Sequence, residues 1–300
     1  MILVTGGTGF IGRTLVRNLV SLGYPVRTLL KPSKQSPKLP KNTPVEVTVC
    51  SLNDVRGLMA ALKDVDTVFH FAGTERLATR ADLNGVDILG TKNIIEAAQQ
   101  SKISHFFFLS HLGSDKNSAY PVLKAKAIAE KSIEQSGIPY TIFRCSNVYG
   151  PGDQFVVSLA RLLRLSPGFF FLPGNGLSAL QPLWIDDLIT SLLISMENKE
   201  TLNEILEIGG GEVYTFRDIV EMILITINLK RSLIQISPGY LRILAVYMDQ
   251  FMKKFPVSLF WLDTLAEDRT TRLDVLPRRF GILPARFSQK INFLQNELIV

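Results

Sequence analysis

Three glycines at a three-residue spacing, placed directly after the first apolar run, constrain the fold of this chain more than any other feature. Residues 2–4 are a short apolar run typical of a buried parallel strand, and Gly6, Gly9 and Gly12 follow it. In such a loop one glycine makes the tight turn, one lets the backbone approach a pyrophosphate, and one lets the next helix pack closely on its strand. The spacing therefore predicts a phosphate-binding turn between a first strand and a first helix.

The residues around these glycines complete the predicted site. A helix that begins near Phe10 directs its free N–H groups and the positive end of its dipole toward the phosphates. A turn with a purely structural role is the alternative, but the position between a strand and a helix favours the phosphate site. The loop residues that we expect to contact a dinucleotide are Gly6, Thr8, Gly9, Phe10, Ile11 and Gly12.

Strands and helices alternate through the first half of the chain. This alternation predicts parallel βαβ units and an α/β fold, a doubly wound parallel sheet (Rossmann) covered by helices on both faces. Ligands of such a sheet bind at the carboxyl ends of its strands. The further strands are expected at 26–30, 45–49, 65–71, 106–109 and 140–143, and the helices at 11–22, 55–62, 90–100 and 122–135.

The alternation ends near residue 150, where we place a domain boundary. Residues 1–150 are predicted to form a NAD(P)-binding Rossmann domain, and 151–300 a smaller, mostly helical lobe for a substrate or a partner, interwoven with the first domain. Thr215 and Asp218 resemble a capping box that opens a helix. Other helices are expected at 155–165, 186–196 and within 239–267, and an apolar loop at 169–176.

The positive charge of the chain is concentrated in the segment that carries the glycine loop. Residues 1–45 hold seven bases and no acid, whereas the other 255 residues carry a net charge of −1. This distribution favours an anionic ligand at the loop. No motif of a nucleic-acid reader accompanies the basic residues, so we expect no binding to nucleic acid.

The end of the second strand decides which dinucleotide fits. An acid at this point would hold the ribose 2′-hydroxyl of NAD, but Lys31 stands there, with Lys34 close behind. Because a lysine attracts a 2′-phosphate, the sequence favours NADP(H). The alternative is that residues 31–41 form only a solvated basic loop and that NAD(H) is the ligand.

Cysteine usage and hydropathy give expectations about the surroundings of the chain. Cys50 and Cys145 lie far apart without paired spacing, which fits a reducing compartment without a disulfide framework or a metal site. With no apolar run of transmembrane length and no leader peptide, we expect a cytoplasmic protein or one attached peripherally to a membrane. The positive mean hydropathy of +0.20 points to a partner or membrane surface, or simply to a large core.

Several segments together resemble the extended short-chain dehydrogenase/reductase superfamily. The most similar subgroup is the atypical one that includes the dehydrogenase-like accessory subunit of respiratory complex I, with epimerase/dehydratase-like proteins and photosystem assembly factors as further relatives. The resemblance implies that Phe71, Ala72 and Gly73 also border the cofactor. The segments are 5–12, His70-Phe71-Ala72-Gly73, Gly90-Thr91-Lys92-Asn93, 141–153 and Trp184-Ile185-Asp186-Asp187.

Enzymes of this superfamily use a tyrosine as acid/base and a lysine four residues later that holds the nicotinamide ribose. Tyr120 and Lys124 have this spacing, but an ungapped comparison makes Lys126 the family lysine and puts Val122 at the tyrosine position. Pro121 restricts Tyr120 to extended geometry, so Tyr120 is expected to precede the helix. Both assignments stay open at this point.

Ser110 resembles the serine that ends the fifth strand in these enzymes, or it is a polar strand cap. Two functions are therefore compatible with the sequence. One is a protein that binds NADP(H) for a structural, assembly or redox-sensing role, with its C-terminal lobe on a protein partner or membrane complex. The other is an active NAD(P)-dependent oxidoreductase or nucleotide-sugar epimerase/dehydratase.

Overall fold

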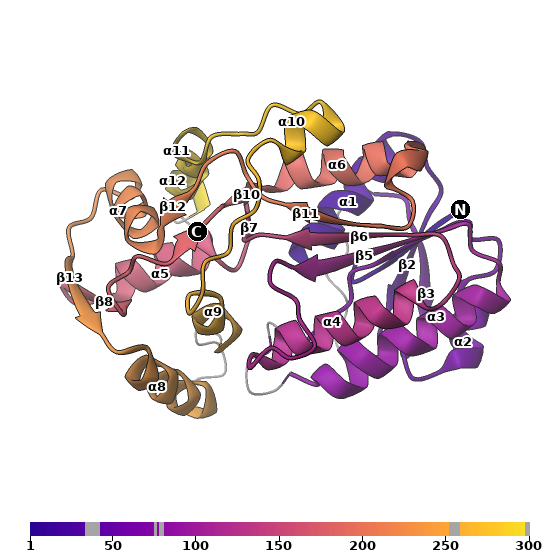
Figure 1. Cartoon of the computed structure of the whole chain (residues 1–300), viewed down its shortest axis with the longest axis horizontal. Helices are drawn as coiled ribbons and strands as arrows, with labels where there is room; N and C mark the ends of the chain where they lie inside the picture. The colour runs from indigo at the N-terminus through magenta and orange to yellow at the C-terminus, as the bar shows by residue number, and fades with distance from the viewer. Residues whose placement is uncertain (34–42, 75–76, 78–80, 252–258, 298–300) are drawn as a thin grey trace. The chain divides into compact units, whose positions relative to one another are not determined.

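The computed structural model describes residues 1–33, 43–74, 77, 81–251 and 259–297 (Figure 1). The chain forms two compact units. The first comprises residues 1–75, 82–144 and 189–206, and the second comprises 76–81, 145–188 and 207–300.

The first unit is built on a seven-stranded sheet whose order is β11-β6-β5-β4-β1-β2-β3. β1 pairs with β2 and with β4 in parallel, and β4 pairs with β5 in the same sense, which confirms the predicted doubly wound sheet. The chain moves outward from β1 in both directions, so the loop after β1 lies where the strand order reverses. The strands are β1 (Ile2–Thr5), β2 (Val26–Leu30), β3 (Glu46–Val49), β4 (Thr67–His70), β5 (His105–His111), β6 (Tyr140–Cys145) and β11 (Glu204–Ile208).

Helices cover both faces of this sheet, and the predicted helices are present with ends that differ by one residue. α2 (Val55–Ala61), α3 (Thr91–Gln100) and α4 (Pro121–Glu134) pack side by side on one face, while α1 (Phe10–Ser21) lies on the other (Figure 1). β5 is buried on both of its faces, as a central parallel strand must be. The rings of Phe69 and Phe107 stack on adjacent strands with centroids 4.4 Å apart.

A π-helix that the sequence did not predict precedes α3. This segment, η2, spans Leu83–Gly90, and the Asp82 carboxylate caps it by accepting a hydrogen bond from the Gly85 N–H at 2.8 Å. The helical prediction began only at residue 90, because the apolar spacing of 83–89 does not follow the 3.6-residue period. π-Helices are rare and occur mostly at functional sites, and η2 carries a buried carboxylate, that of Asp87.

In the second unit one prediction was wrong and others were confirmed. Residues 169–176 were expected to form a loop, but β8 (Phe169–Pro173) pairs in parallel with β13 (Ser232–Ile236), a long-range partner that local sequence does not reveal. The capping box of Thr215 and Asp218 is present. The helices are α5 (Val156–Leu165), α6 (Ile185–Glu197), which continues into the first unit, α7 (Phe216–Thr226), α8 (Pro238–Phe251), α9 (Leu259–Thr264), α10 (Val275–Phe280), α11 (Phe287–Lys290) and α12 (Leu294–Glu297).

Within the described residues, no helix combines the length and the apolar character needed to cross a bilayer.

Candidate functional site

The glycine loop lies at the carboxyl end of β1, and its geometry requires glycine. Gly6 has φ +71°, and a Cβ there would lie 2.6 Å from the carbonyl carbon and oxygen of Phe71. A Cβ on Gly12 would collide with the Gly6 carbonyl oxygen. Two of the three glycines are therefore fixed by close backbone approach, as the spacing predicted.

The loop leads directly into α1, which begins at Phe10. Gly9 is the N-cap, its N–H donates to the Gly6 carbonyl at 2.9 Å, and no acid lies in the first turn. Thr8 and Gly9 are exposed, whereas the Phe10 side chain is buried, so that residue can offer a ligand only its backbone. This arrangement of a glycine turn and a free helix N-terminus fits a pyrophosphate.

The predicted loop after β4 lies against the glycine loop. The Thr5 hydroxyl accepts hydrogen bonds from the N–H groups of Phe71 at 3.2 Å and Ala72 at 3.1 Å. Gly73, the third residue predicted there, is exposed. Thr5 thus fixes the position of residues 71–72 against the glycine turn, and the predicted residues of both loops are brought to one edge of the sheet.

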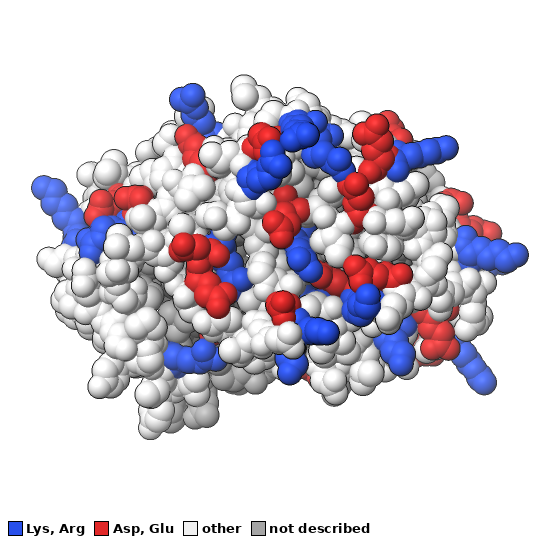
Figure 2. All heavy atoms as spheres, in the orientation of Figure 1, with Lys and Arg blue, Asp and Glu red and all other residues white. Residues whose placement is uncertain are grey.

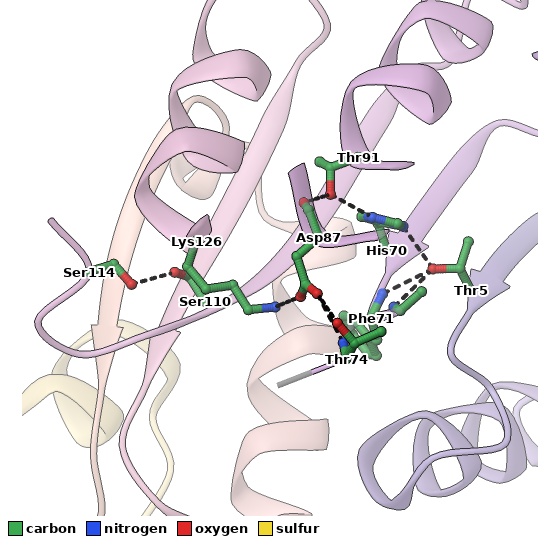
Figure 3. A network of polar contacts seen from close by, with 10 residues as sticks. Thr5, His70, Phe71, Thr74, Asp87, Thr91, Ser110, Ser114 and Lys126 are labelled. Carbon is green, nitrogen blue, oxygen red and sulfur yellow. Dashed lines mark hydrogen bonds and ion pairs between the residues drawn. The ribbon is translucent and has the colours of Figure 1, made fainter. Parts of the chain in front are cut away.

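His70 links three elements at this edge of the sheet from the protein interior. Its imidazole is fully buried between the Thr5 hydroxyl, 2.8 Å from Nδ1, and the Thr91 hydroxyl, 3.0 Å from Nε2 (Figure 3). Burial, followed by the positive charge of Lys126, lowers the pKa of His70 to about 3. His70 is therefore neutral at physiological pH and ties β1, β4 and α3 together.

Lys126 and Asp87 form a buried ion pair next to this network. The Lys126 Nζ lies 3.7 Å from Oδ1 of Asp87 and 5.1 Å from the centroid of the Phe108 ring. The other carboxylate oxygen of Asp87 accepts from the Thr74 hydroxyl at 2.6 Å and from the Thr74 N–H at 3.0 Å (Figure 3). The Asp87 carbonyl accepts from the Thr91 hydroxyl at 2.6 Å, which joins this pair to His70.

Asp87 was missed by the sequence analysis. It lies 39 positions before Lys126, in a helical segment that was not predicted, and no motif linked the two residues. The signal that was present is an acid inside an otherwise apolar stretch, Val86-Asp87-Ile88-Leu89, because charged residues are rarely buried without a partner.

Tyr120 stands at the start of α4, and Val122 and Lys126 lie on a buried face of the same helix. Tyr120 is the N-cap of α4 with extended backbone angles (φ −92°, ψ 116°), so it precedes the helix. Lys124 is exposed, whereas Val122 and Lys126 are both buried, four residues apart on one helical face.

Ser110 lies at the end of β5 and is buried. Its hydroxyl is 3.0 Å from that of Ser114, which donates to the His111 carbonyl at 2.8 Å. Figure 3 shows this hydroxyl pair on the β5 side of Lys126. Both serine hydroxyls thus take part in hydrogen bonds at the end of β5.

Lys31, expected near the ribose of the adenine half, is exposed directly after β2. Lys34, Lys38 and Lys41 lie outside the described residues. The two cysteines, Cys50 and Cys145, are separate buried thiols. Among the residues that the structure describes, no group of histidine, cysteine and acidic side chains has the geometry to hold a metal ion.

Comparison with known proteins agrees with this geometry. Residues 6–155 match the model of the NAD(P)H-binding family. The chain is 29% identical over 222 residues to the photosystem II assembly factor Ycf39 of Cyanophora paradoxa, covering 74% of this chain and 67% of that protein. It is 22% identical over 309 residues to the mitochondrial NADH dehydrogenase (ubiquinone) 1 alpha subcomplex subunit 9 of Arabidopsis thaliana, covering 95% and 76%.

Solved structures show the same fold. The UDP-glucose 4-epimerase of Thermotoga maritima, solved with UDP-glucose, superimposes with a TM-score of 0.75 at 21% identity, over 99% of this chain and 98% of that one. The predicted resemblance to atypical short-chain dehydrogenases with an epimerase-like fold is thereby confirmed.

Proposed function

The chain belongs to the NAD(P)H-binding family, and from that premise we propose that it binds NADP(H) without transferring hydride. One observation carries this proposal, the presence of Val122 where the catalytic enzymes of the superfamily place their tyrosine. The dinucleotide is held by the glycine loop, the N-terminus of α1 and residues 71–73. Lys126 holds the nicotinamide ribose. Binding then serves a structural, assembly or redox-sensing role.

The absence of a usable acid at this position supports the proposal. Reduction of a carbonyl group by hydride, or oxidation of an alcohol, requires a group within hydrogen-bond reach that gives a proton to the oxygen or takes one from it. Valine has no such group, and Tyr120 stands before the helix rather than on the face that carries Lys126. The neighbouring His70 is held neutral and fully buried by its two threonine partners.

The preference for the phosphorylated dinucleotide rests on the end of β2. Lys31 is exposed there, and no acid lies within the described residues 26–33. A carboxylate would hold the ribose 2′-hydroxyl of NAD and repel a 2′-phosphate, whereas an exposed ammonium group attracts the 2′-phosphate.

The role in assembly rests on the second unit and on the relatives. One relative is named as an assembly factor and another as a subunit of a respiratory enzyme. On α8, four large apolar side chains at spacings of three and four residues are exposed, which is the pattern of a helix face that meets a partner. They are Tyr240, Ile243, Leu244 and Tyr247. We propose that a protein partner covers this face.

Titration of the purified chain with NADPH, NADP⁺, NADH and NAD⁺ tests the proposal. Tight binding of NADPH is the expected result, with no oxidation of bound NADPH by an added quinone and no conversion of UDP-glucose by the protein loaded with NADP⁺ or NAD⁺. Turnover that disappears in Tyr120→Phe would instead establish the active oxidoreductase or epimerase. Tighter binding of NADH than of NADPH would contradict the cofactor preference.

A further inference from the structure

A buried charge pair, Lys126 with Asp87, lies beside the predicted position of the nicotinamide. The binding role proposed above explains the lysine but not its carboxylate partner. The Lys126 side chain is 6% exposed and the Asp87 side chain 2%. Two ribose hydroxyls are neutral and do not balance the charge of a buried lysine, whereas the Asp87 carboxylate does. Burying a second charge costs free energy, so the presence of Asp87 calls for a physical reason.

The surroundings hold the carboxylate in one place. Thr74 donates two hydrogen bonds to Asp87 Oδ2, and Oδ1 is left toward the lysine at 3.7 Å. Figure 3 shows the carboxylate between the Lys126 ammonium group and the Thr74 side chain. Asp87 is therefore preorganised to face Lys126.

The positive charge of Lys126 acts beyond its direct contacts. It contributes, after burial, to the lowered pKa of His70. Because these side chains are buried, a unit charge here affects any charged group bound nearby.

The nicotinamide ring is such a group, because it carries a positive charge when oxidised and none when reduced. Building on the proposed function, we propose that Asp87 is a specificity-determining residue that cancels the charge of Lys126 and so lets the protein hold NADP⁺ as well as NADPH. Without Asp87, Lys126 repels the oxidised ring and leaves the reduced ring unaffected.

The size of the effect follows from Coulomb's law. At a separation of about 8 Å and an effective dielectric constant of about 30, one uncompensated charge weakens binding of a cation about tenfold. Asp87→Asn is therefore expected to raise the ratio of the NADP⁺ dissociation constant to the NADPH dissociation constant about tenfold. Lys126→Met, which leaves Asp87 alone, is expected to lower this ratio.

The experiment measures both dissociation constants, by fluorescence and calorimetry, for the wild type and for Asp87→Asn, Lys126→Met and the double variant. The double variant has no charge at either position, so its ratio is expected to return to the wild-type value. Because the double variant replaces the ion pair by neutral groups, its ratio can be compared with that of Lys126→Met if Asp87→Asn alone fails to fold. Binding of 2′,5′-ADP, which lacks the nicotinamide, is the control and is expected to be unchanged in all variants.

The ratio separates this role from a purely structural one. A structural role of Asp87 would change the affinities for NADP⁺ and NADPH by the same factor, and an unchanged ratio in Asp87→Asn would overturn the inference. Failure of the wild type to bind either nucleotide would instead overturn the proposed function on which the inference rests.

Discussion

The two compact units of this protein differ in the groups that mark them, which are a buried polar network in the first unit and the most exposed apolar side chains of the described residues in the second. In the first unit, charged and polar groups are buried, among them His70, Asp87 and Lys126. In the second unit, large apolar groups are exposed, among them Ile243 at 68% and Ile225 at 79%. Buried polar groups cost stability unless every partner is in place, so a set of them marks a site. The candidate site of the first unit therefore lies among buried polar groups, whereas the candidate surface of the second unit is made of exposed apolar side chains.

The largest expected effect concerns two isoleucines on α7. They test whether the second unit has a well-packed core beneath its exposed apolar side chains. Ile223 is fully buried and Ile225 is exposed, two residues apart on one helix. Ile223→Ser removes buried methyl groups and buries a hydroxyl, and is expected to lower the free energy of unfolding by about 4 kcal/mol.

Ile225→Ser is the matched control and is expected to change the free energy of unfolding by less than about 0.5 kcal/mol. Urea denaturation of the two variants gives both values. Similar losses in the two variants would mean that this side of α7 is covered by another surface, and the contrast between the units would fail.

The second largest effect concerns the glycine loop. Gly6→Ala places a methyl group 2.6 Å from the Phe71 carbonyl and is expected to weaken NADPH binding about 100-fold, because residues 71–72 must move away from the turn. Gly137→Ala is the control. Gly137 has φ +74°, close to the +71° of Gly6, but open space around its Cβ position.

Both glycine variants share the cost of a left-handed backbone with a side chain, about 1 kcal/mol of unfolding free energy. Only Gly6→Ala is expected to lose NADPH affinity in a fluorescence titration. Equal affinities in the two variants would show that the close approach of the two loops has no part in binding.

The choice between the two lysines gives a smaller effect. Lys126→Met is expected to weaken NADPH binding about tenfold by removing a charged donor to the ribose. Lys124→Met lies on the same helix but is exposed and is expected to change the dissociation constant by less than about twofold. The reverse order of effects would restore the literal pairing of Tyr120 with Lys124.

Much of the first unit could be predicted from sequence because its signals are local. The glycine spacing and the apolar runs of β1 and β2 (Val26–Leu30) are each contained in a few consecutive residues. Pro121 was enough to predict that Tyr120 stands before α4. Backbone geometry of this kind depends on neighbours in the chain, so no partner from elsewhere is needed to predict it.

The parts that were missed depend on distant partners. β8 carries a proline and is bounded by Gly168 and Gly174, which are typical of a loop, and only β13, about 60 positions later, makes it a strand. Asp87 can likewise be recognised as a site residue only through its ion pair with Lys126. The packing of η2 against α4 brings these two residues together. Polar networks of this kind are specified by the fold as a whole, so a single sequence does not reveal them.

The smallest expected effect is a dependence of the free energy of unfolding on pH. It arises from the buried His70 of the first unit. His70 has a pKa of about 3 in the folded chain and 6.5 in the unfolded chain, because burial and Lys126 disfavour its charged form. Below pH 6.5 the unfolded state therefore binds a proton that the folded state does not, and stability falls as the pH falls from 6.5 toward 3. Between pH 7 and pH 5.5 this contribution is about 1 kcal/mol.

Replacing His70 by asparagine removes this contribution, so His70→Asn is expected to lose about 1 kcal/mol less than the wild type over that interval. His105, with a pKa lowered to about 4, acts in the same direction, and Asp153, with a pKa raised to about 6, acts in the opposite one. Both residues are present in the two proteins, so their contributions cancel in the difference. Urea denaturation at the two pH values measures that difference, and parallel losses would show that His70 carries a proton inside the folded protein.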